Sequence, residues 1–175
     1  MSHLQPHIRW FKTLGLNDVA QVGGKNASLG EMYQKLTGEG IRVPNGFAVT
    51  SDAYRYVLEH NNAWAPLHAA LDGLDPDDIK DLQARGKRAR AVVYGCTLPD
   101  DLKAAILQGY AELQHEYGNS LSLAVRSSAT AEASPQASFA GQNETYLNIA
   151  GEEALLDAYK RCLASHFTDR SLHYQ

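Results

Sequence analysis

The hydrophobic pattern changes its period near residue 120, and this change constrains the fold more than any other feature of the sequence. Before that point, apolar residues recur at helical spacings, as they do at Leu102, Ile106, Tyr110 and Leu113. Residues 121–126 instead alternate between apolar and small or polar side chains, which is typical of a half-buried strand. Strand character returns at residues 144–149, after a polar loop. The sequence therefore predicts a mixed fold of the α/β (α+β) class.

Helical spacing predicts five helices, over residues 26–36, 52–60, 76–94, 99–117 and 152–167, and a short buried strand at residues 47–50. Capping signals support one end of three of these helices. Ser51 precedes the second helix, Asp75 precedes the third and Gly118 follows the fourth. The third and fourth helices follow each other closely, so we expect them to form a hairpin. The third also carries the densest basic run, at Arg85, Lys87, Arg88 and Arg90. We interpret this run as a solvated helix face, because no aromatic residues interleave with it.

The composition indicates one globular domain and excludes several classes of protein. The chain has 175 residues, of which 44% are hydrophobic and 21% charged, which excludes a disordered polymer, a collagen-like repeat and a coiled coil. The formal net charge of −4 provides no basic excess for binding nucleic acid. No signal-peptide pattern is seen, and no apolar stretch approaches the roughly 20 residues of a membrane span. Cys96 and Cys162 form no paired motif, so neither a disulfide framework nor a zinc site can be argued, and we expect a cytoplasmic protein.

The sequence lacks the signatures of several functional classes. It contains no HExxH, EF-hand, GxSxG, GxGxxG or paired-cysteine motif, which removes support for a zinc hydrolase, a calcium sensor, a serine hydrolase and a dinucleotide fold. The seven histidines are scattered, and none stands at metal-ligand spacing with another: His3, His7, His60, His68, His115, His166 and His173. We therefore assign no catalytic and no metal-binding residue in this sequence.

A glycine pair followed by a lysine, Gly23-Gly24-Lys25, stands directly before the predicted helix at residues 26–36. Glycines at a helix start expose backbone N–H groups, the helix end is partially positive, and Lys25 adds a full charge. The segment can therefore hold a phosphate. It is not a P-loop, because the GxxxxGK[ST] pattern is absent and no strongly apolar strand precedes it. Ordinary turn chemistry is the alternative interpretation, and these residues alone leave it open.

Arg126 stands at the end of a predicted strand and is followed by a polar loop with several hydroxyl side chains. A planar guanidinium binds phosphate oxygens in two-point fashion, and nearby hydroxyls can complete the contacts. The alternative is an arginine that forms a surface salt bridge. Residues 138–145 surround Gly141 with small side chains, which lets the backbone approach a ligand closely. An ordinary loop that returns to a strand has the same composition, so both alternatives stay open.

Taken together and in this order, these motifs resemble the N-terminal nucleotide-binding region of the phosphoenolpyruvate synthases, also called pyruvate, water dikinases. The resemblance lies in residues 11–32, 43–54, 124–148 and 162–174, and its span covers nearly the whole chain. The related pyruvate, phosphate dikinases resemble the first block but not the serine-rich loop. Rifampicin phosphotransferases resemble both, so a rifampicin-phosphotransferase-like ATP-binding region is an alternative.

The resemblance implies an ATP-grasp-type N-terminal lobe, truncated, with residues 1–175 as a single domain. It implies ATP as the ligand, with Lys25 and Arg126 at its phosphates and with Gly141 and Thr145 lining the nucleotide site. In such synthases a phosphoryl group passes from ATP to a histidine on a swivelling domain and then to pyruvate in a barrel domain. The second lobe with its magnesium-binding acids, the histidine domain and the barrel have no counterpart in this sequence. Mg²⁺ and pyruvate are therefore expected only through domains absent here.

One of the matching blocks departs from the family pattern. Where the family usually has Ala-Glu-Asp-Leu-Pro-Asp, residues 131–136 are Ala-Glu-Ala-Ser-Pro-Gln, so Ala133 and Gln136 replace two acids. The exchange removes two negative charges from the loop that the resemblance places beside ATP. Together with the missing lobe, it favours a second alternative, a non-catalytic nucleotide-binding module or truncated remnant.

Overall fold

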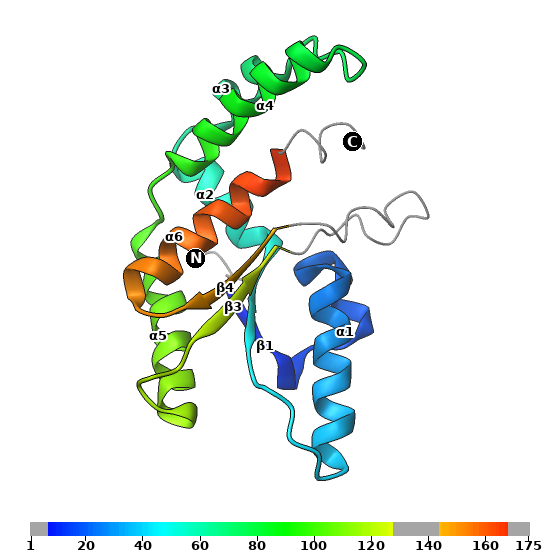
Figure 1. Ribbon diagram of the computed structural model, residues 1–175, viewed down its shortest axis with the longest axis vertical. Helices are drawn as coiled ribbons and strands as arrows, with labels where there is room; N and C mark the ends of the chain where they lie inside the picture. The colour runs from blue at the N-terminus through cyan, green and yellow to red at the C-terminus, as the bar shows by residue number, and fades with distance from the viewer. Residues whose placement is uncertain (1–6, 128–143, 168–175) are drawn as a thin grey trace, which may run out of the picture. The chain divides into compact units, whose positions relative to one another are not determined.

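The structure is a computed structural model that describes residues 7–127 and 144–167 (Figure 1). These residues form two compact units. The first unit contains residues 7–54 and 100–121, and the second contains residues 55–99, 122–127 and 144–167. Within the described ranges, no helix is long and apolar enough to cross a membrane.

A small antiparallel sheet lies in the first unit. Its strands are β1 (Ile8–Trp10) and β2 (Phe47–Val49), and Trp10 lies opposite Phe47. The rings of these two residues are 5.2 Å apart between centroids. β2 confirms the strand predicted at residues 47–50. β1 is not predicted from the sequence, because three residues are too few to show an alternating pattern.

α5 (Asp100–Tyr117) confirms the helix predicted at residues 99–117, and it ends where Gly118 adopts a φ of 97°. Its Gly109 comes so close to the Phe47 ring that a Cβ atom there would lie 2.7 Å from Cε1. At its C-terminal end, the Tyr117 hydroxyl accepts a hydrogen bond of 2.8 Å from the backbone N–H of Asn45. α5 thus contacts the chain at Asn45, just before β2, and at Phe47, the first residue of β2. Its buried residues are Leu102, Ile106, Gly109, Tyr110 and Leu113.

α1 (Val19–Gly38) follows two 3₁₀ turns, Phe11–Thr13 and Leu16–Asp18, and is interrupted at Gly23. There φ is 83° and ψ is 162°, a backbone conformation that residues with a Cβ rarely adopt. The segment is therefore one helical turn, a break, and a regular helix from residue 24 onward. The predicted helix at residues 26–36 is confirmed, with a start two residues earlier.

The buried face of α1 consists of small residues. Its buried members are Val22, Gly23, Ala27 and Gly30. The backbone at Gly30 lies so close to the fully buried Leu14 that a Cβ there would overlap the Leu14 Cβ. The helical spacing at residues 26–36 also predicts Met32 on the apolar side of the helix, and this prediction is wrong, because Met32 is 43% exposed. The helix packs by close backbone approach, and large side chains cannot occupy that face.

α2 (Ser51–His60) is capped by Thr50, not by Ser51 as predicted. Thr50 is buried, and its Oγ1 accepts a hydrogen bond of 3.3 Å from the backbone N–H of Ala53. Ser51 instead donates its hydroxyl to the carbonyl of Ala20, at 3.0 Å. The helix ends at His60, as the predicted range of 52–60 has it, just before Asn61 and Asn62.

The second unit contains α3 (Trp64–Leu71), α4 (Ile79–Tyr94) and α6 (Glu152–Ala164), which continues into the 3₁₀ turn Ser165–Phe167. α4 packs against both α3 and α6 (Figure 1). The predicted hairpin of α4 with α5 is wrong, because α4 takes α3 and α6 as its partners whereas α5 belongs to the first unit. The sequence does not predict α3, whose eight residues bury only Leu67 and Ala70.

The N-terminus of α4 lies three residues later than predicted. Asp78, not Asp75, is the N-cap, and its Oδ1 accepts hydrogen bonds from the backbone N–H groups of Lys80 (3.1 Å) and Asp81 (3.2 Å). Asp75 instead closes a tighter turn, in which its carboxylate accepts a hydrogen bond of 3.0 Å from the Asp77 N–H.

The predicted solvated face of α4 is wrong for two of its four basic residues. Arg85 donates to the carbonyl oxygens of Ala70 and Asp72, at the end of α3. Arg90 donates to the carbonyl of Phe167 at 2.8 Å. These bonds satisfy carbonyl groups that helix ends leave without intrahelical partners.

β3 (Leu123–Arg126) and β4 (Thr145–Ile149) form the antiparallel pair of the second unit and confirm the two predicted strands, each with a slightly later start. α6 packs against both strands (Figure 1). Helices together with two small antiparallel sheets confirm the predicted α+β character in the described part of the chain.

Candidate functional site

Lys25 is exposed on the turn that follows the break at Gly23. The side-chain amide of Asn26 spans the break by donating a 3.0 Å hydrogen bond to the carbonyl of Val22. The break gives α1 a second N-terminal end at this point, and such an end carries a partial positive charge. With the Lys25 ammonium beside it, this part of the helix has the electrostatics of an anion site.

The segment before the break is held by side chains from other elements. Arg9 of β1 donates to Gln21 Oε1 (2.6 Å), to Asp18 Oδ1 (3.3 Å) and to the carbonyl of Thr13 (2.8 Å). Arg9 and Asp18 are half-buried, and the bonds to Asp18 and Gln21 are partly shielded from water. These bonds connect the segment before Gly23 to β1. The sequence analysis missed Arg9, because no local pattern relates it to α1.

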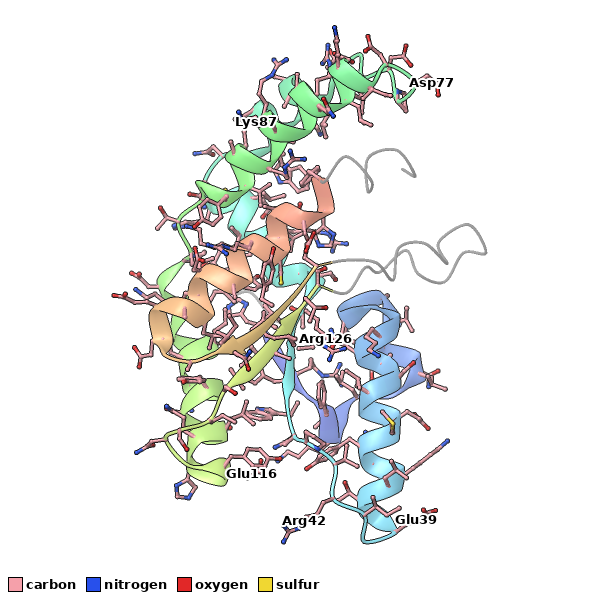
Figure 2. All side chains as sticks on the ribbon, in the orientation of Figure 1. Glu39, Arg42, Asp77, Lys87, Glu116 and Arg126 are labelled. Atoms are coloured by element: carbon pink, nitrogen blue, oxygen red, sulfur yellow. The ribbon has the colours of Figure 1, made fainter. Side chains whose placement is uncertain are left out.

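Arg126 and Thr145 are brought together by the register of the strand pair. They lie directly opposite each other in β3 and β4, and both are exposed. The pairing continues by a 3.2 Å hydrogen bond from the Ser127 N–H to the carbonyl of Glu144. Figure 2 shows Arg126 at the end of β3. No carboxylate among the described residues forms an ion pair with its guanidinium, so the fork is available to an anion.

The face of the strand pair opposite Arg126 is fixed to α6 and α4. Arg161 of α6 lies over the Tyr146 ring, 6.0 Å from its centroid, and its Nε forms a 2.9 Å ion pair with Asp157. The Tyr94 hydroxyl of α4 donates to the same carboxylate. Burial raises the pKa of Tyr146, and nearby Cys162 and Glu144 add to this shift. These contacts hold the strand pair against α6, while the other face of the pair stays exposed.

The structure thus assembles only part of the predicted site. Arg126 and Thr145 are neighbours in the second unit, whereas Lys25 lies in the first. Gly141 and the serine-rich segment at residues 128–143 lie outside the described residues. Ser127, the last described residue before that segment, has a buried Oγ without a hydrogen-bond partner among the described residues.

The described part of the chain offers neither a metal site nor an activated nucleophile. No group of three His, Cys, Asp or Glu side chains in residues 7–127 and 144–167 is placed to hold a metal ion. Burial raises the pKa of Cys96, and it raises that of Cys162 to about 12, with a smaller contribution from Glu144. Burial also lowers the pKa of His166. Each of these shifts favours the neutral form.

We expect both thiols of the native chain to react slowly with a thiol reagent at pH 8, because the thiolate is the reactive form. Cys162 should be the slower, since its pKa of about 12 lies well above the ordinary value. The pKa is raised in the folded state, so the associated stability is complete below the unfolded pKa and is lost as the pH rises toward about 12. The reaction is followed by absorbance, and the chain in urea, where both thiols should react rapidly, is the control. A native thiol that reacts at the unfolded rate contradicts the burial argument.

Comparison with known families gives the decisive observation. Residues 19–175 match the family described as pyruvate phosphate dikinase, AMP/ATP-binding domain. The chain belongs to this family. The match begins at the first residue of α1 and includes the Lys25 turn and both strands that carry Arg126 and Thr145.

Relatives in this dikinase family include phosphoenolpyruvate synthases from three bacteria. The chain is 47% identical to that of Aquifex aeolicus over 169 residues, 48% identical to that of Helicobacter pylori over 170 residues and 46% identical to that of Escherichia coli over 170 residues. These alignments cover 96%, 97% and 97% of the chain, but only 20%, 21% and 21% of the relatives. The chain thus spans about a fifth of the length of these relatives.

The comparisons confirm the resemblance drawn from the motifs. They support an ATP-binding portion of a phosphoenolpyruvate-synthase-like protein, and they do not favour the rifampicin-phosphotransferase or remnant alternatives. The match to an AMP/ATP-binding domain also supports a nucleotide as the ligand. The individual site residues remain predictions.

Proposed function

We propose that this dikinase-family chain supplies part of the ATP site of a phosphotransferase that forms phosphoenolpyruvate from pyruvate. The observation that carries the proposal is the exposed Arg126 at the end of β3, which lies opposite Thr145 at the start of β4 in a chain of the AMP/ATP-binding family. A guanidinium with no ion pair to a carboxylate of the described residues, next to a hydroxyl on the same sheet face, is suited to phosphate oxygens.

Each proposed residue contributes through position and charge, which supply most of the catalysis in phosphoryl transfer. Arg126 holds phosphate oxygens through its planar fork, and the Thr145 hydroxyl donates a further hydrogen bond. Lys25 adds a point charge at the glycine break of α1, where the helix end is itself partially positive. Gly141, which lies outside the described residues, is proposed to line the nucleotide site.

The remaining parts of the proposal concern fold and partners. Residues 1–175 form a single N-terminal lobe of the ATP-grasp type, in a cytoplasmic protein. Mg²⁺ accompanies ATP, and the described residues hold no cluster of ligands for it. Pyruvate and the phosphohistidine step are proposed to depend on parts of such a synthase outside residues 1–175.

Titration of ATP against the purified chain tests the proposal. We expect binding with an affinity no tighter than about millimolar, or roughly −4 kcal/mol, because these residues supply only part of the contacts around the nucleotide. Calorimetry, or chemical shifts of backbone amides where the heat is too small, provides the measurement. No response at tens of millimolar would contradict the proposed site, and micromolar binding would show that the site is complete without a second lobe.

A further inference from the structure

The exposed face of the β3–β4 pair is part polar and part apolar. Arg126 and Thr145 lie at one end, and Leu147 and Ala124 continue the same face along the strands. Leu147 is 64% exposed, so a large apolar side chain lies on the same face as the polar pair. The residues of the opposite face are less exposed and pack on α6: Leu123, Val125, Tyr146 and Ile149.

A β-bulge follows Leu147 in β4, and strand alternation from Thr145 places Leu147 on the exposed face. The register pairs Val125 with Tyr146 and Leu123 with Ile149, so β4 has one residue more than β3 between these pairs. Asn148 absorbs the extra residue with a φ of 58°, a left-handed conformation that asparagine tolerates. Ile149 therefore returns to the face that packs on α6, while Leu147 shares the outer face with Thr145. Bulges of this kind are frequent next to binding sites, where they direct a side chain.

The chemistry of this face matches a ligand with an anionic end and an apolar end. Two residues along a strand span about 7 Å, so Leu147 lies about that far from the Arg126–Thr145 pair. This distance is similar to the length of a sugar. Inorganic phosphate could bind to the Arg126–Thr145 pair, but it has no apolar part that would contact Leu147. We propose that Leu147, with Ala124 beside it, forms the subsite on which the base of the nucleotide rests. This inference depends on the proposed function, because it assumes that Arg126 and Thr145 hold the phosphates.

A second exposed aliphatic residue shows why exposure alone does not make such a subsite. Ile79, at the start of α4, is 67% exposed, slightly more than Leu147. It stands between Asp78 and Lys80 at the start of α4, outside the β3–β4 face. Ile79 is therefore a matched control for the loss of an exposed apolar side chain.

The test compares ATP with tripolyphosphate, which carries the phosphates without sugar or base. We expect Leu147→Ala to weaken ATP binding by about tenfold and to leave tripolyphosphate binding unchanged, since only the apolar contact is lost. Leu147→Met, which keeps an apolar side chain of similar size, should retain most of the ATP affinity. Ile79→Ala should change neither ligand. Both ligands are titrated against the whole chain by calorimetry or by amide chemical shifts.

Each alternative result has a distinct meaning. If the parent binds ATP and Leu147→Ala binds it as well as Ile79→Ala does, the base subsite is wrong while the proposed function stands. Equal affinity of the parent for ATP and tripolyphosphate overturns the subsite in the same way. If the parent binds neither ligand, the proposed function fails and the subsite fails with it. Thermal melts of the variants establish that each one is folded. If Leu147→Ala does not fold, Leu147→Met still tests the subsite.

Discussion

Replacing Gly30 by alanine should destabilise the chain by about 1–3 kcal/mol, the usual cost of overpacking a core. The new Cβ would overlap the Leu14 Cβ and lie 2.8 Å from the Leu14 carbonyl oxygen. Leu14 is fully buried, and backbone atoms cannot move aside as the end of a long side chain can. Alanine gains about 1 kcal/mol over glycine in helix propensity, but this gain is smaller than the expected overlap cost. Urea unfolding followed by circular dichroism measures the difference.

Gly38 in the same helix provides the matched control. It is the last residue of α1, and a Cβ there would meet no atom within 4 Å. Gly38→Ala should therefore leave stability unchanged or raise it by up to about 1 kcal/mol, through the reduced entropy of the unfolded chain. Equal effects of the two substitutions would show that α1 does not approach Leu14 closely, and the account of its small-residue face would be wrong.

This close approach also explains why hydrophobic periodicity does not find the most buried residues of α1. A search for large apolar residues at helical spacing finds Met32, which the structure leaves 43% exposed. Ala27 and Gly30 carry the contact instead, and small residues give no hydrophobic signal. In α5 the same search succeeds, because Leu102 and Ile106 fill the space between elements and are fully buried. Periodicity predicts packing where side chains fill the core, and it fails where backbones meet.

The candidate site shows a similar division. Arg126 is predicted at a strand end and Thr145 at the start of another strand, and both predictions hold. Their direct pairing depends on a register that includes a bulge at Asn148, and no residue pattern within either strand specifies it. Supporting contacts such as Arg9 with Gln21 join different elements, so they become visible only in three dimensions. The chemical groups of the site can thus be recognised from short stretches of sequence. The contacts that support these groups cannot, because they join different elements.

Arg126→Ala is expected to remove nucleotide binding and to leave stability almost unchanged. Hydrogen bonds to charged groups contribute about 1.5–3 kcal/mol, so the loss corresponds to an affinity weaker by about tenfold to hundredfold, and at its upper end a millimolar ligand gives no measurable response. The guanidinium is exposed and has no ion pair among the described residues, so its removal should change the free energy of unfolding by no more than about 0.5 kcal/mol. Lys25→Ala should likewise weaken ATP binding with a stability change of similar size.

Two other arginines make this prediction specific. Arg88 is exposed on α4, so Arg88→Ala removes the same charge and should alter neither ATP binding nor melting. Arg85 is bonded to two carbonyl oxygens at the end of α3 and to Asp81, so Arg85→Ala should lower the melting temperature without changing ATP affinity. Thermal melts with and without ATP separate these outcomes for all four variants. A large drop in the melting temperature of Arg126→Ala without ligand would mean that Arg126 supports the fold, because stranding the partner of a buried ion pair costs about 3–5 kcal/mol. Lys25 would then be the remaining phosphate contact supported by charge and position.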